Sequence, residues 1–431
     1  MDIKQSVGFI EEHFNEDFFS NLLQHISTEA RYISHEEMIL SSKTGFSIKF
    51  NNQSINNKAR VVGLRAFRLR YNGPKYTGEQ AVRIIFKIKA KGSDSVKKLY
   101  NLFSIKGYDK LLDAYEKKPF NFISNTELKE IAVYNVQHPV FKAIGPKIFT
   151  TISDTDKDVY LIAMEDLNNG SEFSHLNMAE DLLVWDHDDV LDAFRAISSV
   201  HALYFDKPHD IPDELKTIIT GPHADLRIYD HPYTRKFIRC SVEHNLKKFP
   251  DIFNFNLRNI LQNSLDNMDE IIAILHDFPV TLVHADFTPR NMCFRKNPKS
   301  NEKRACIYDW EFVRVMNPQY DAALFISAIV PESSEAHAKW MEYLELYRTC
   351  FQNELEHIGA PLDIINMVTN KDKFKAVFDM CCIEMMWNMR GSVLTVTEFM
   401  PMPHFLPYIK SVCEYIRSFA SEYPFLKAEN K

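Results

Sequence analysis

The chain has 431 residues, of which 45% are hydrophobic and 25% charged, and both proportions are ordinary for a folded protein. This length is sufficient for two domains, each with its own core. The net charge of −7 implies no broad basic surface, which argues against a nucleic-acid partner. The seven cysteines are scattered without zinc-binding spacing, so we expect reduced thiols.

Signals for secretion or membrane insertion are not evident in the sequence. The N-terminus carries acidic residues where a signal peptide has a basic region. Uninterrupted apolar runs stay well below the roughly 18 residues that a membrane span requires. We therefore expect a cytoplasmic protein without a membrane partner.

The first part of the chain combines helical and strand patterns. Apolar residues at helical spacing predict helices at 5–26, 95–112 and 125–137. Alternating or short apolar runs predict strands at 47–50, 61–71, 82–90 and 160–164. The runs 61–71 and 82–90 flank the turn-rich sequence YNGPKYTGE, so we expect them to form a hairpin.

The remainder of the chain is mainly helical. Helices are predicted at 187–205, 232–247, 257–276, 319–330, 335–357, 372–389 and 406–422. The single β structure predicted in this part is a hairpin with strands at 292–294 and 305–308. A strand-rich segment followed by a helical one predicts an α+β fold with two lobes, which we place at 1–164 and 165–431.

The most informative segment runs from Thr281 to Phe312 and contains three polar residues whose spacing is typical of a catalytic loop. Asp286 follows an apolar strand, Asn291 comes five residues later, and Asp309 follows the hairpin. Phosphoryl transfer requires a carboxylate that takes the proton of a hydroxyl, and hard oxygen ligands for Mg²⁺. We interpret Asp286 as the base and Asn291 with Asp309 as the metal ligands. The alternatives are a solvated loop aspartate, a turn asparagine and a helix N-cap.

Two neighbours of these residues have less specific roles. Glu311 is either a supporting carboxylate or a solvated surface residue. His284 is expected to hydrogen-bond the backbone and hold the loop rather than to carry a proton.

Nucleotide contacts are predicted from the strand at 82–90 and the helix at 125–137. Lys87 is the candidate for the α- and β-phosphates, with Lys89 in reserve, and it requires an acidic partner. Glu130 is that partner, with Glu127 as the alternative. An ordinary solvated strand face would explain the lysines equally well.

Adenine and phosphate contacts are less clear in the sequence. The segment from Glu165 to Leu167 ends an apolar strand, where the backbone can bind an adenine edge. No G-x-G-x-x-G motif is present, and Gly45, Gly63 or the asparagine-rich stretch 51–58 are the candidates for a phosphate-covering loop.

The motifs VHADFTPRNM, IYDWEF and NPQYDAALF resemble the aminoglycoside phosphotransferase and choline kinase-like enzymes. The resemblance implies a protein-kinase-like fold, with a small strand-rich nucleotide-binding N-lobe and a large helical C-lobe that carries the catalytic loop. It also implies that Asp286 is the catalytic base, that Asn291 and Asp309 bind Mg²⁺, and that Asp321 packs under the catalytic loop. DWE stands where protein kinases have DFG, and no APE-type segment follows, which argues against a protein substrate.

We therefore expect an enzyme that uses ATP or GTP and Mg²⁺ to phosphorylate a hydroxyl of a small molecule, acting as a monomer or homodimer. The acceptor is an amino sugar, a choline-like compound or another hydroxylated metabolite. The alternative is a nucleotidyl-transferring or non-catalytic kinase-like protein. Acidic and aromatic residues of the helical region either bind the acceptor or form core: Trp340, Glu342, Tyr343, Tyr347, Glu384, Trp387, Glu398, Phe399, His404 and Phe405.

Overall fold

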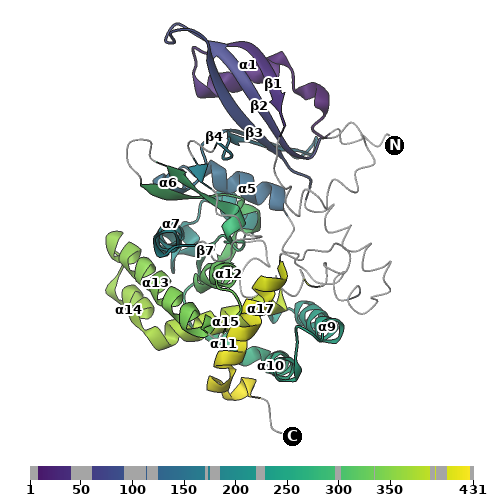
Figure 1. The fold of residues 1–431 in the computed structure, drawn as a ribbon, viewed down its shortest axis with the longest axis vertical. Coiled ribbons are helices and arrows are strands. Elements are labelled where there is room, and N and C mark those ends of the chain that lie inside the picture. Colours follow the sequence, from purple (N-terminus) through teal and green to yellow (C-terminus); the bar gives the residue numbers. More distant parts are fainter. Residues whose placement is uncertain are drawn as a thin grey trace. The chain divides into compact units, whose positions relative to one another are not determined.

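The structure is a computed structural model, and it forms two compact units (Figure 1). The first unit contains most of the described residues up to Phe173, and the second contains most of those from Ser174 onward. The structure describes residues 8–39, 61–91, 113, 125–169, 173–174, 185–219, 229–296, 302–333, 335–388, 394 and 405–427.

A five-stranded antiparallel sheet with the order β1-β2-β3-β5-β4 is the centre of the first unit. Its strands are β1 (Arg31–Met38), β2 (Gly63–Asn72), β3 (Gln80–Ile88), β4 (Ile148–Asp154) and β5 (Val159–Glu165). The predicted hairpin of β2 and β3 is confirmed, as is the apolar strand β5. The edge strands β1 and β4 were not predicted, because they bury few side chains fully and lack a clear apolar alternation.

Helices cover both faces of this sheet. They are η1 (Glu11–His13), α1 (Glu16–Ile26), α5 (Thr126–Asn135) and α6 (Pro139–Ile144). Phe19 of α1 packs with Phe67 and Phe86 on one face, whereas Ile131 of α5 packs with Ile85 on the opposite face. The predicted helix 5–26 begins later, at Glu16, because Asn15 caps it by accepting a hydrogen bond from Phe18 N at 3.0 Å.

The alternation of side chains along β3 determines which residues face α5. Ile84, Phe86 and Ile88 point into the core beneath α1. Lys87 and Lys89 therefore lie on the opposite face, on the side of α5. The predicted helix 125–137 is confirmed as α5, but the predicted strand 47–50 and helix 95–112 lie outside the described residues.

The second unit consists mainly of helices. They are α7 (His187–Tyr204), α8 (Asp213–Ile219), α9 (Pro232–Lys248), α10 (Phe255–Asp266), α11 (Met268–His276), α12 (Gln319–Ile329), α13 (Ala336–His357), α14 (Leu362–Thr369), α15 (Lys371–Trp387) and α17 (Leu406–Phe419). Short 3-10 turns occur at η2 (Pro208–Asp210), η4 (Pro289–Asn291), η5 (Trp310–Phe312), η7 (Ala420–Glu422) and η8 (Pro424–Leu426). Short strands are β6 (Phe173–Ser174), β7 (Thr281–Val283), β8 (Met292–Lys296), β9 (Lys303–Ile307) and β10 (Arg314–Met316).

Most predicted helices of this part are confirmed within a few residues. The predicted helix 257–276 is instead two helices, because the chain leaves helical geometry at Asn267 (φ −113°, ψ 39°). The side chain of Asn267 donates there to Asn263 O at 2.9 Å and to Phe425 O at 3.1 Å. The short helices α8 and α14 were not predicted.

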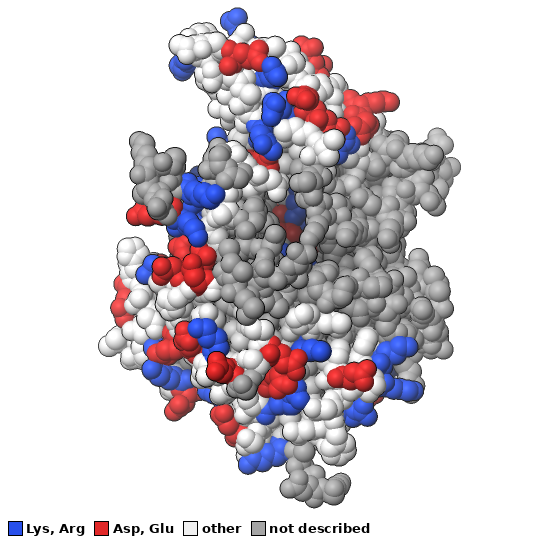
Figure 2. Space-filling view, viewed as in Figure 1, with Lys and Arg blue, Asp and Glu red and all other residues white. Residues whose placement is uncertain are grey.

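The predicted fold class is confirmed, since a strand-rich unit precedes a larger, mainly helical one. On the face shown in Figure 2, basic and acidic side chains of the described residues are interspersed over the second unit. Within the described part of the chain, no helix is both long and apolar enough to cross a membrane.

A buried carboxylate joins α15 to the C-terminal end of the second unit. Asp379 is fully buried, and its Oδ1 accepts a hydrogen bond from Tyr415 at 2.7 Å. Its Oδ2 accepts from Lys375 and from Tyr423, both at 2.8 Å. Burial raises the pKa of Asp379 to about 6, although the charge of Lys375 opposes this effect. Protonation of the Asp379 carboxyl is therefore easier in the folded state than in the unfolded chain.

This raised pKa predicts a pH dependence of stability. The contribution of Asp379 is fully present below the pKa of the unfolded chain, near 4, and roughly 3 kcal/mol is lost as the pH rises through about 6. An Asp379→Asn variant lacks this ionisation. The melting temperature of the wild type should therefore fall relative to that of Asp379→Asn between about pH 4 and pH 7. A difference that stays constant with pH, measured by differential scanning fluorimetry, would contradict the assignment.

Candidate active site

The loop that carries Asp286 begins where strand β7 ends. Strand β10 pairs antiparallel with β7, and Arg314 lies opposite Val283, the last residue of β7. Ala285 then adopts a left-handed backbone conformation (φ 62°), which is costly for a residue with a side chain. Such a conformation is retained only where surrounding contacts stabilise it.

Asp321, on α12, supplies these contacts. Its Oδ2 accepts a hydrogen bond from His284 N at 2.7 Å, and its Oδ1 accepts from Ala285 N at 2.8 Å. The ring of His201, on α7, lies 3.1 Å from Oδ2 through Nε2 and 2.7 Å from the hydroxyl of Tyr347 through Nδ1. All of these side chains are buried, so the loop conformation is fixed from beneath. This is the place that the family resemblance implied for Asp321.

His284 connects the loop to the segment before Asp309. Its Nδ1 lies 3.2 Å from Asp286 N, a donor, and its Nε2 lies 2.9 Å from Tyr308 O, an acceptor. These partners assign the ring proton to Nε2. His284 is thus engaged on both nitrogens with the backbone, as expected for a residue that holds the loop.

Asp286 is nearly inaccessible, with 3% of its surface exposed, and its two carboxylate oxygens have different surroundings. Oδ2 accepts hydrogen bonds from Arg290 Nη2 at 2.9 Å and from Asn291 Nδ2 at 2.7 Å. Oδ1 is buried and has no hydrogen-bond partner among the described residues. The carboxylate is therefore oriented through one oxygen, while the hydrogen-bonding capacity of the other is unused within the described residues.

Arg290 was not singled out in the sequence. Its guanidinium pairs with Asp286 and lies over the ring of Phe405, 4.8 Å from the ring centre. Burial opposes the charged guanidinium, but Asp286 raises the pKa of Arg290 above its ordinary value. An arginine four residues after Asp286, on the same short loop, was the signal available in the sequence.

Asn291 and the segment before Asp309 are joined through the backbone. Tyr308 N donates to Asn291 O at 2.9 Å, so the β8–β9 hairpin returns the chain to Asn291. The Nδ2 of Asn291 donates to Asp286 O at 2.9 Å as well as to the carboxylate, which orients the amide. Its amide oxygen is the atom suited to a metal.

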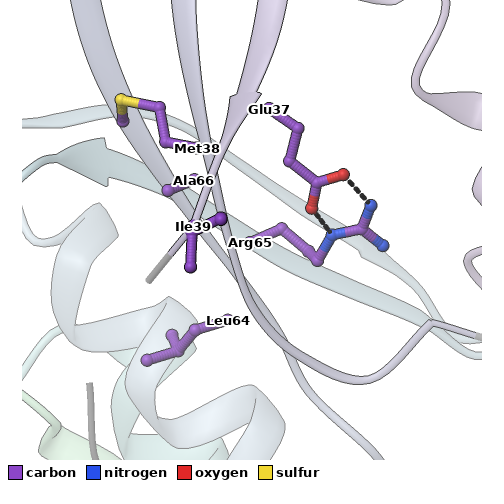
Figure 3. A pocket seen from close by; sticks show the side chains of 6 residues that line it. All are labelled: Glu37, Met38, Ile39, Leu64, Arg65 and Ala66. Carbon is purple, nitrogen blue, oxygen red and sulfur yellow. Dashed lines mark hydrogen bonds and ion pairs between the residues drawn. The ribbon is translucent and has the colours of Figure 1, made fainter. Parts of the chain in front are cut away.

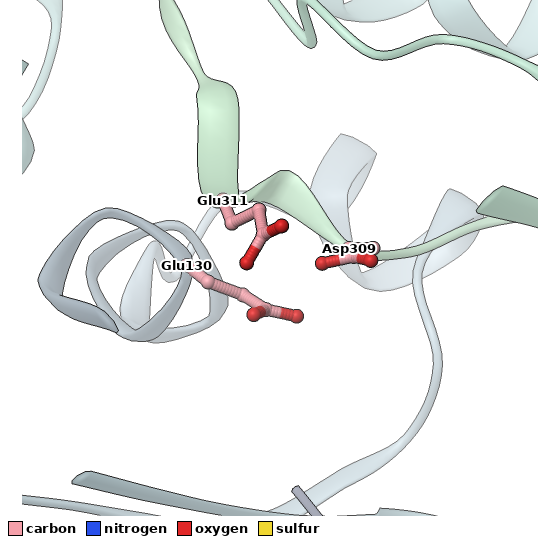
Figure 4. Close-up of side chains that lie close together, drawn as sticks. All are labelled: Glu130, Asp309 and Glu311. Carbon is pink, nitrogen blue, oxygen red and sulfur yellow. The ribbon is translucent and has the colours of Figure 1, made fainter. Parts of the chain in front are cut away.

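Asp309 and Glu311 belong to the turn that follows this hairpin. Asp309 has a left-handed backbone conformation (φ 66°) and precedes η5. Carboxylate oxygens of Asp309 and Glu311 lie within 4.8 Å of each other, and both side chains turn to the same side of the turn (Figure 4). Two oxygens on one Mg²⁺ are roughly 3 to 4 Å apart, so this hard donor set fits the ion with small side-chain adjustments.

In the first unit, Lys87 and Glu130 are brought together as predicted, and Lys89 joins them. The ammonium of Lys87 lies 2.8 Å from the carboxylate of Glu130, on α5, and Lys89 donates to the same carboxylate. Glu130 is 1% exposed, whereas the Lys87 and Lys89 side chains are 12% and 6% exposed. Glu130 thus positions both lysines, and Lys87 is the more accessible one.

The strand end at Glu165 is partly engaged within the sheet. Glu165 N donates to Lys147 O at 3.0 Å, and its Oε1 accepts from Lys147 N at 2.6 Å. Asp166 accepts hydrogen bonds from both nitrogens of Asn168, and Leu167 between them is buried. The amide of Glu165 is therefore occupied, which leaves Leu167 as the better candidate for an adenine contact.

The candidates for a phosphate-covering loop remain a prediction. Gly45 and residues 51–58 lie outside the described residues, and Gly63 (φ 125°) is the first residue of β2. A shallow pocket at β1 and β2 contains no predicted site residue (Figure 3). It is lined by Glu37, Met38, Ile39, Leu64, Arg65 and Ala66.

Most of the described aromatic residues that were predicted as candidates for binding the acceptor belong to the hydrophobic core. Trp340 is buried and donates to Ser411 Oγ at 3.2 Å, and Trp387 is buried and donates to Ser264 Oγ at 3.0 Å. Tyr343 is also buried, and Glu342 pairs with a surface lysine. Glu398, Phe399 and His404 lie outside the described residues.

These elements define a kinase-like protein, the class predicted from the motifs. The chain belongs to the ecdysteroid kinase-like family, whose family model matches residues 78–360. No curated protein matches the sequence.

Solved structures of three kinds of small-molecule kinase are similar to the chain. A choline kinase from Cryptosporidium parvum Iowa II has 12% identity and a TM-score of 0.44, over 92% of this chain and 90% of that one. A GDP complex of aminoglycoside 2'-phosphotransferase-IIIa has 11% identity and a TM-score of 0.43, over 95% and 100%. An ethanolamine kinase from Plasmodium vivax has 12% identity and a TM-score of 0.41, over 96% and 92%. Likenesses this low identify no activity for the chain.

The shared carboxylate of Glu130 predicts different effects for the two lysines. Lys87→Ala should raise the KM for MgATP and lower kcat, with a loss in kcat/KM of at least about tenfold, because it removes the accessible ammonium. The effects of Lys87→Ala and Glu130→Ala should be non-additive in a double-mutant cycle, because both residues form one ion pair. Lys89→Ala is the matched control and should have a milder kinetic effect. A larger loss for Lys89→Ala would assign the phosphate contact to Lys89.

Proposed function

We propose that the chain is a phosphotransferase that moves the γ-phosphoryl group of ATP or GTP to a hydroxyl of a small molecule, with Mg²⁺ as cofactor. The observation that carries this proposal is the asymmetric carboxylate of Asp286. One oxygen is held by Arg290 and Asn291, and the other is buried and has no hydrogen-bond partner in the part of the chain that the structure describes. A carboxylate that is oriented through one oxygen can accept a proton from an acceptor hydroxyl at the other.

In the proposed reaction, the hydroxyl of the acceptor donates a hydrogen bond to Asp286 Oδ1. As its oxygen forms the bond to the γ-phosphorus, the bond to the β-γ bridging oxygen breaks, and a nucleoside diphosphate leaves. The hydroxyl proton passes to Asp286 Oδ1. Arg290 keeps the carboxylate oriented throughout, since its hydrogen bond is made to the other oxygen.

The metal and the nucleotide would be held by oxygen ligands and by cationic side chains. Asn291 and Asp309 would bind Mg²⁺, with Glu311 in support; the bound ion neutralises the negative charge of the phosphates. Lys87, oriented by Glu130, would contact the phosphates, and the backbone at Glu165 and Leu167 would contact the base. In this proposal residues 1–164 form the nucleotide-binding lobe, and residues 165–431 supply the catalytic loop and the acceptor site.

The acceptor class is proposed from the names of the relatives. The family is named for ecdysteroid kinases, and the similar structures are enzymes named for choline, ethanolamine and aminoglycosides. All of these compounds carry at least one alcohol group, which is the group that Asp286 would deprotonate. We propose a cytoplasmic enzyme, active as a monomer or homodimer, for an alcohol of this kind.

The direct test is turnover of four acceptors with MgATP and MgGTP: ecdysone, kanamycin, choline and ethanolamine. Formation of nucleoside diphosphate and of phosphorylated acceptor in equal amounts, detected by mass spectrometry and abolished by a chelator, would support the proposal. Binding of MgATP in a thermal shift assay without turnover of any acceptor would instead support a non-catalytic kinase-like protein.

Asp286→Asn should reduce kcat by at least about 100-fold, because a positioned general base typically contributes a factor of 10² to 10⁴. The amide retains the shape of the side chain, so the melting temperature and the affinity for MgATP should change little. Arg290→Lys is a useful comparison, because it retains the charge beside Asp286 but not the planar guanidinium. Near-normal phosphorylation by Asp286→Asn would remove Asp286 from the mechanism.

A further inference from the structure

A second buried carboxylate, Glu384 on α15, lies in a polar cluster that the proposed chemistry does not use. Its Oε1 accepts a hydrogen bond from the hydroxyl of Tyr229 and one from Asn388 Nδ2 at 2.9 Å. The guanidinium of Arg314 lies 3.5 Å from the same oxygen. Burial raises the pKa of Tyr229 well above its ordinary value, so the phenol stays protonated and donates a hydrogen bond to Glu384.

The other oxygen of Glu384 has no such partners. Glu384 is fully buried, yet within the described part of the chain its Oε2 makes no hydrogen bond, and neither does the buried Nε of Arg314. A buried charged group with an unsatisfied atom is costly, and folded proteins seldom retain one without a reason. Asp379 shows the contrast: it lies on the same helix, is equally buried, and has partners on both oxygens.

The position of the cluster connects it to the catalytic loop. Arg314 is the first residue of β10 and pairs with Val283, which directly precedes the loop. The guanidinium lies over the ring of Tyr320, 4.5 Å from its centre, and Tyr320 is the neighbour of Asp321 in the chain. The Arg314 side chain is 17% exposed, whereas that of Glu384 is 0% exposed, so Arg314 is the more accessible member of this pair.

We propose that Glu384 Oε2 and Arg314 Nε bind one hydroxyl of the acceptor, separate from the hydroxyl that is phosphorylated. A hydroxyl donates to a carboxylate and accepts from a guanidinium at the same time, so it satisfies both atoms. An ammonium group cannot accept the hydrogen bond of Arg314. The acceptor therefore carries at least two hydroxyls; this inference rests on the proposed phosphotransferase function.

The test compares Glu384→Gln with Asp379→Asn, a matched control on the same helix. With ecdysone or kanamycin as a polyhydroxylated probe, Glu384→Gln should raise the acceptor KM about 10- to 100-fold, the effect of losing a hydrogen bond to a charged group. The KM for MgATP should change less than about twofold. Asp379→Asn should leave the acceptor KM unchanged. Arg314→Lys keeps the positive charge but lacks Nε, so it should raise the acceptor KM as Glu384→Gln does.

The site formed by Glu384 Oε2 and Arg314 Nε is called the hydroxyl subsite, and the following outcomes would contradict it. An unchanged acceptor KM in both Glu384→Gln and Arg314→Lys would overturn it, as would an equal rise in Asp379→Asn. Turnover of choline or ethanolamine, but of neither polyhydroxylated probe, would overturn the subsite and leave the phosphotransferase function intact. A crystal structure with a water retained between Glu384 and Arg314 while a probe is bound would also overturn it. Turnover of none of the four acceptors would contradict the phosphotransferase function and, with it, the subsite.

Discussion

The hydrogen bonds of Asp321 are the interaction on which the candidate active site depends. One buried carboxylate accepts from two consecutive backbone amides, those of His284 and Ala285, and thereby stabilises a left-handed alanine. An alanine in that conformation costs roughly 1 to 3 kcal/mol, and hydrogen bonds to a charged group are strong enough to offset it. The turn that results presents Asp286 to Arg290 and Asn291, so the proposed base is oriented by a residue that does not touch the substrate.

Two simple constraints of backbone geometry bring the other predicted residues together within each unit. A hairpin returns the chain to its starting point, which is why Tyr308, just before Asp309, bonds to the backbone of Asn291. Alternation along a strand places Lys87 and Lys89 on one face, and α5 packs on that face with Glu130. Within each unit these residues are distant in the sequence, yet local backbone geometry fixes the position of each.

Much of this could be predicted from the sequence because the patterns are local. The apolar periodicity of α7, α12 and α13 gave their bounds within a residue or two, and the motif around Asp286 placed Asp286 and Asn291 on one loop. The edge strands β1 and β4 could not be predicted, since their pairing comes from the neighbouring strand and not from their own pattern. The contact of Arg290 with Asp286 was not evident in the sequence, because only three-dimensional contacts show which oxygen of a carboxylate is occupied. Glu384 was among the predicted acceptor candidates, but the difference between its two oxygens appears only in those contacts.

Hydrogen exchange at the loop that carries Asp286 most directly tests whether Asp321 fixes the geometry of the candidate site. Asp321→Asn places an amide NH₂ where one carboxylate oxygen accepted a backbone N–H, so at least one of the two hydrogen bonds is lost. Exchange of the peptide that contains His284, Ala285 and Asp286 should become faster, while the helices α13 and α15 keep their protection. Unchanged protection of this loop in Asp321→Asn, with the variant folded, would contradict the claim that Asp321 fixes the geometry of the site.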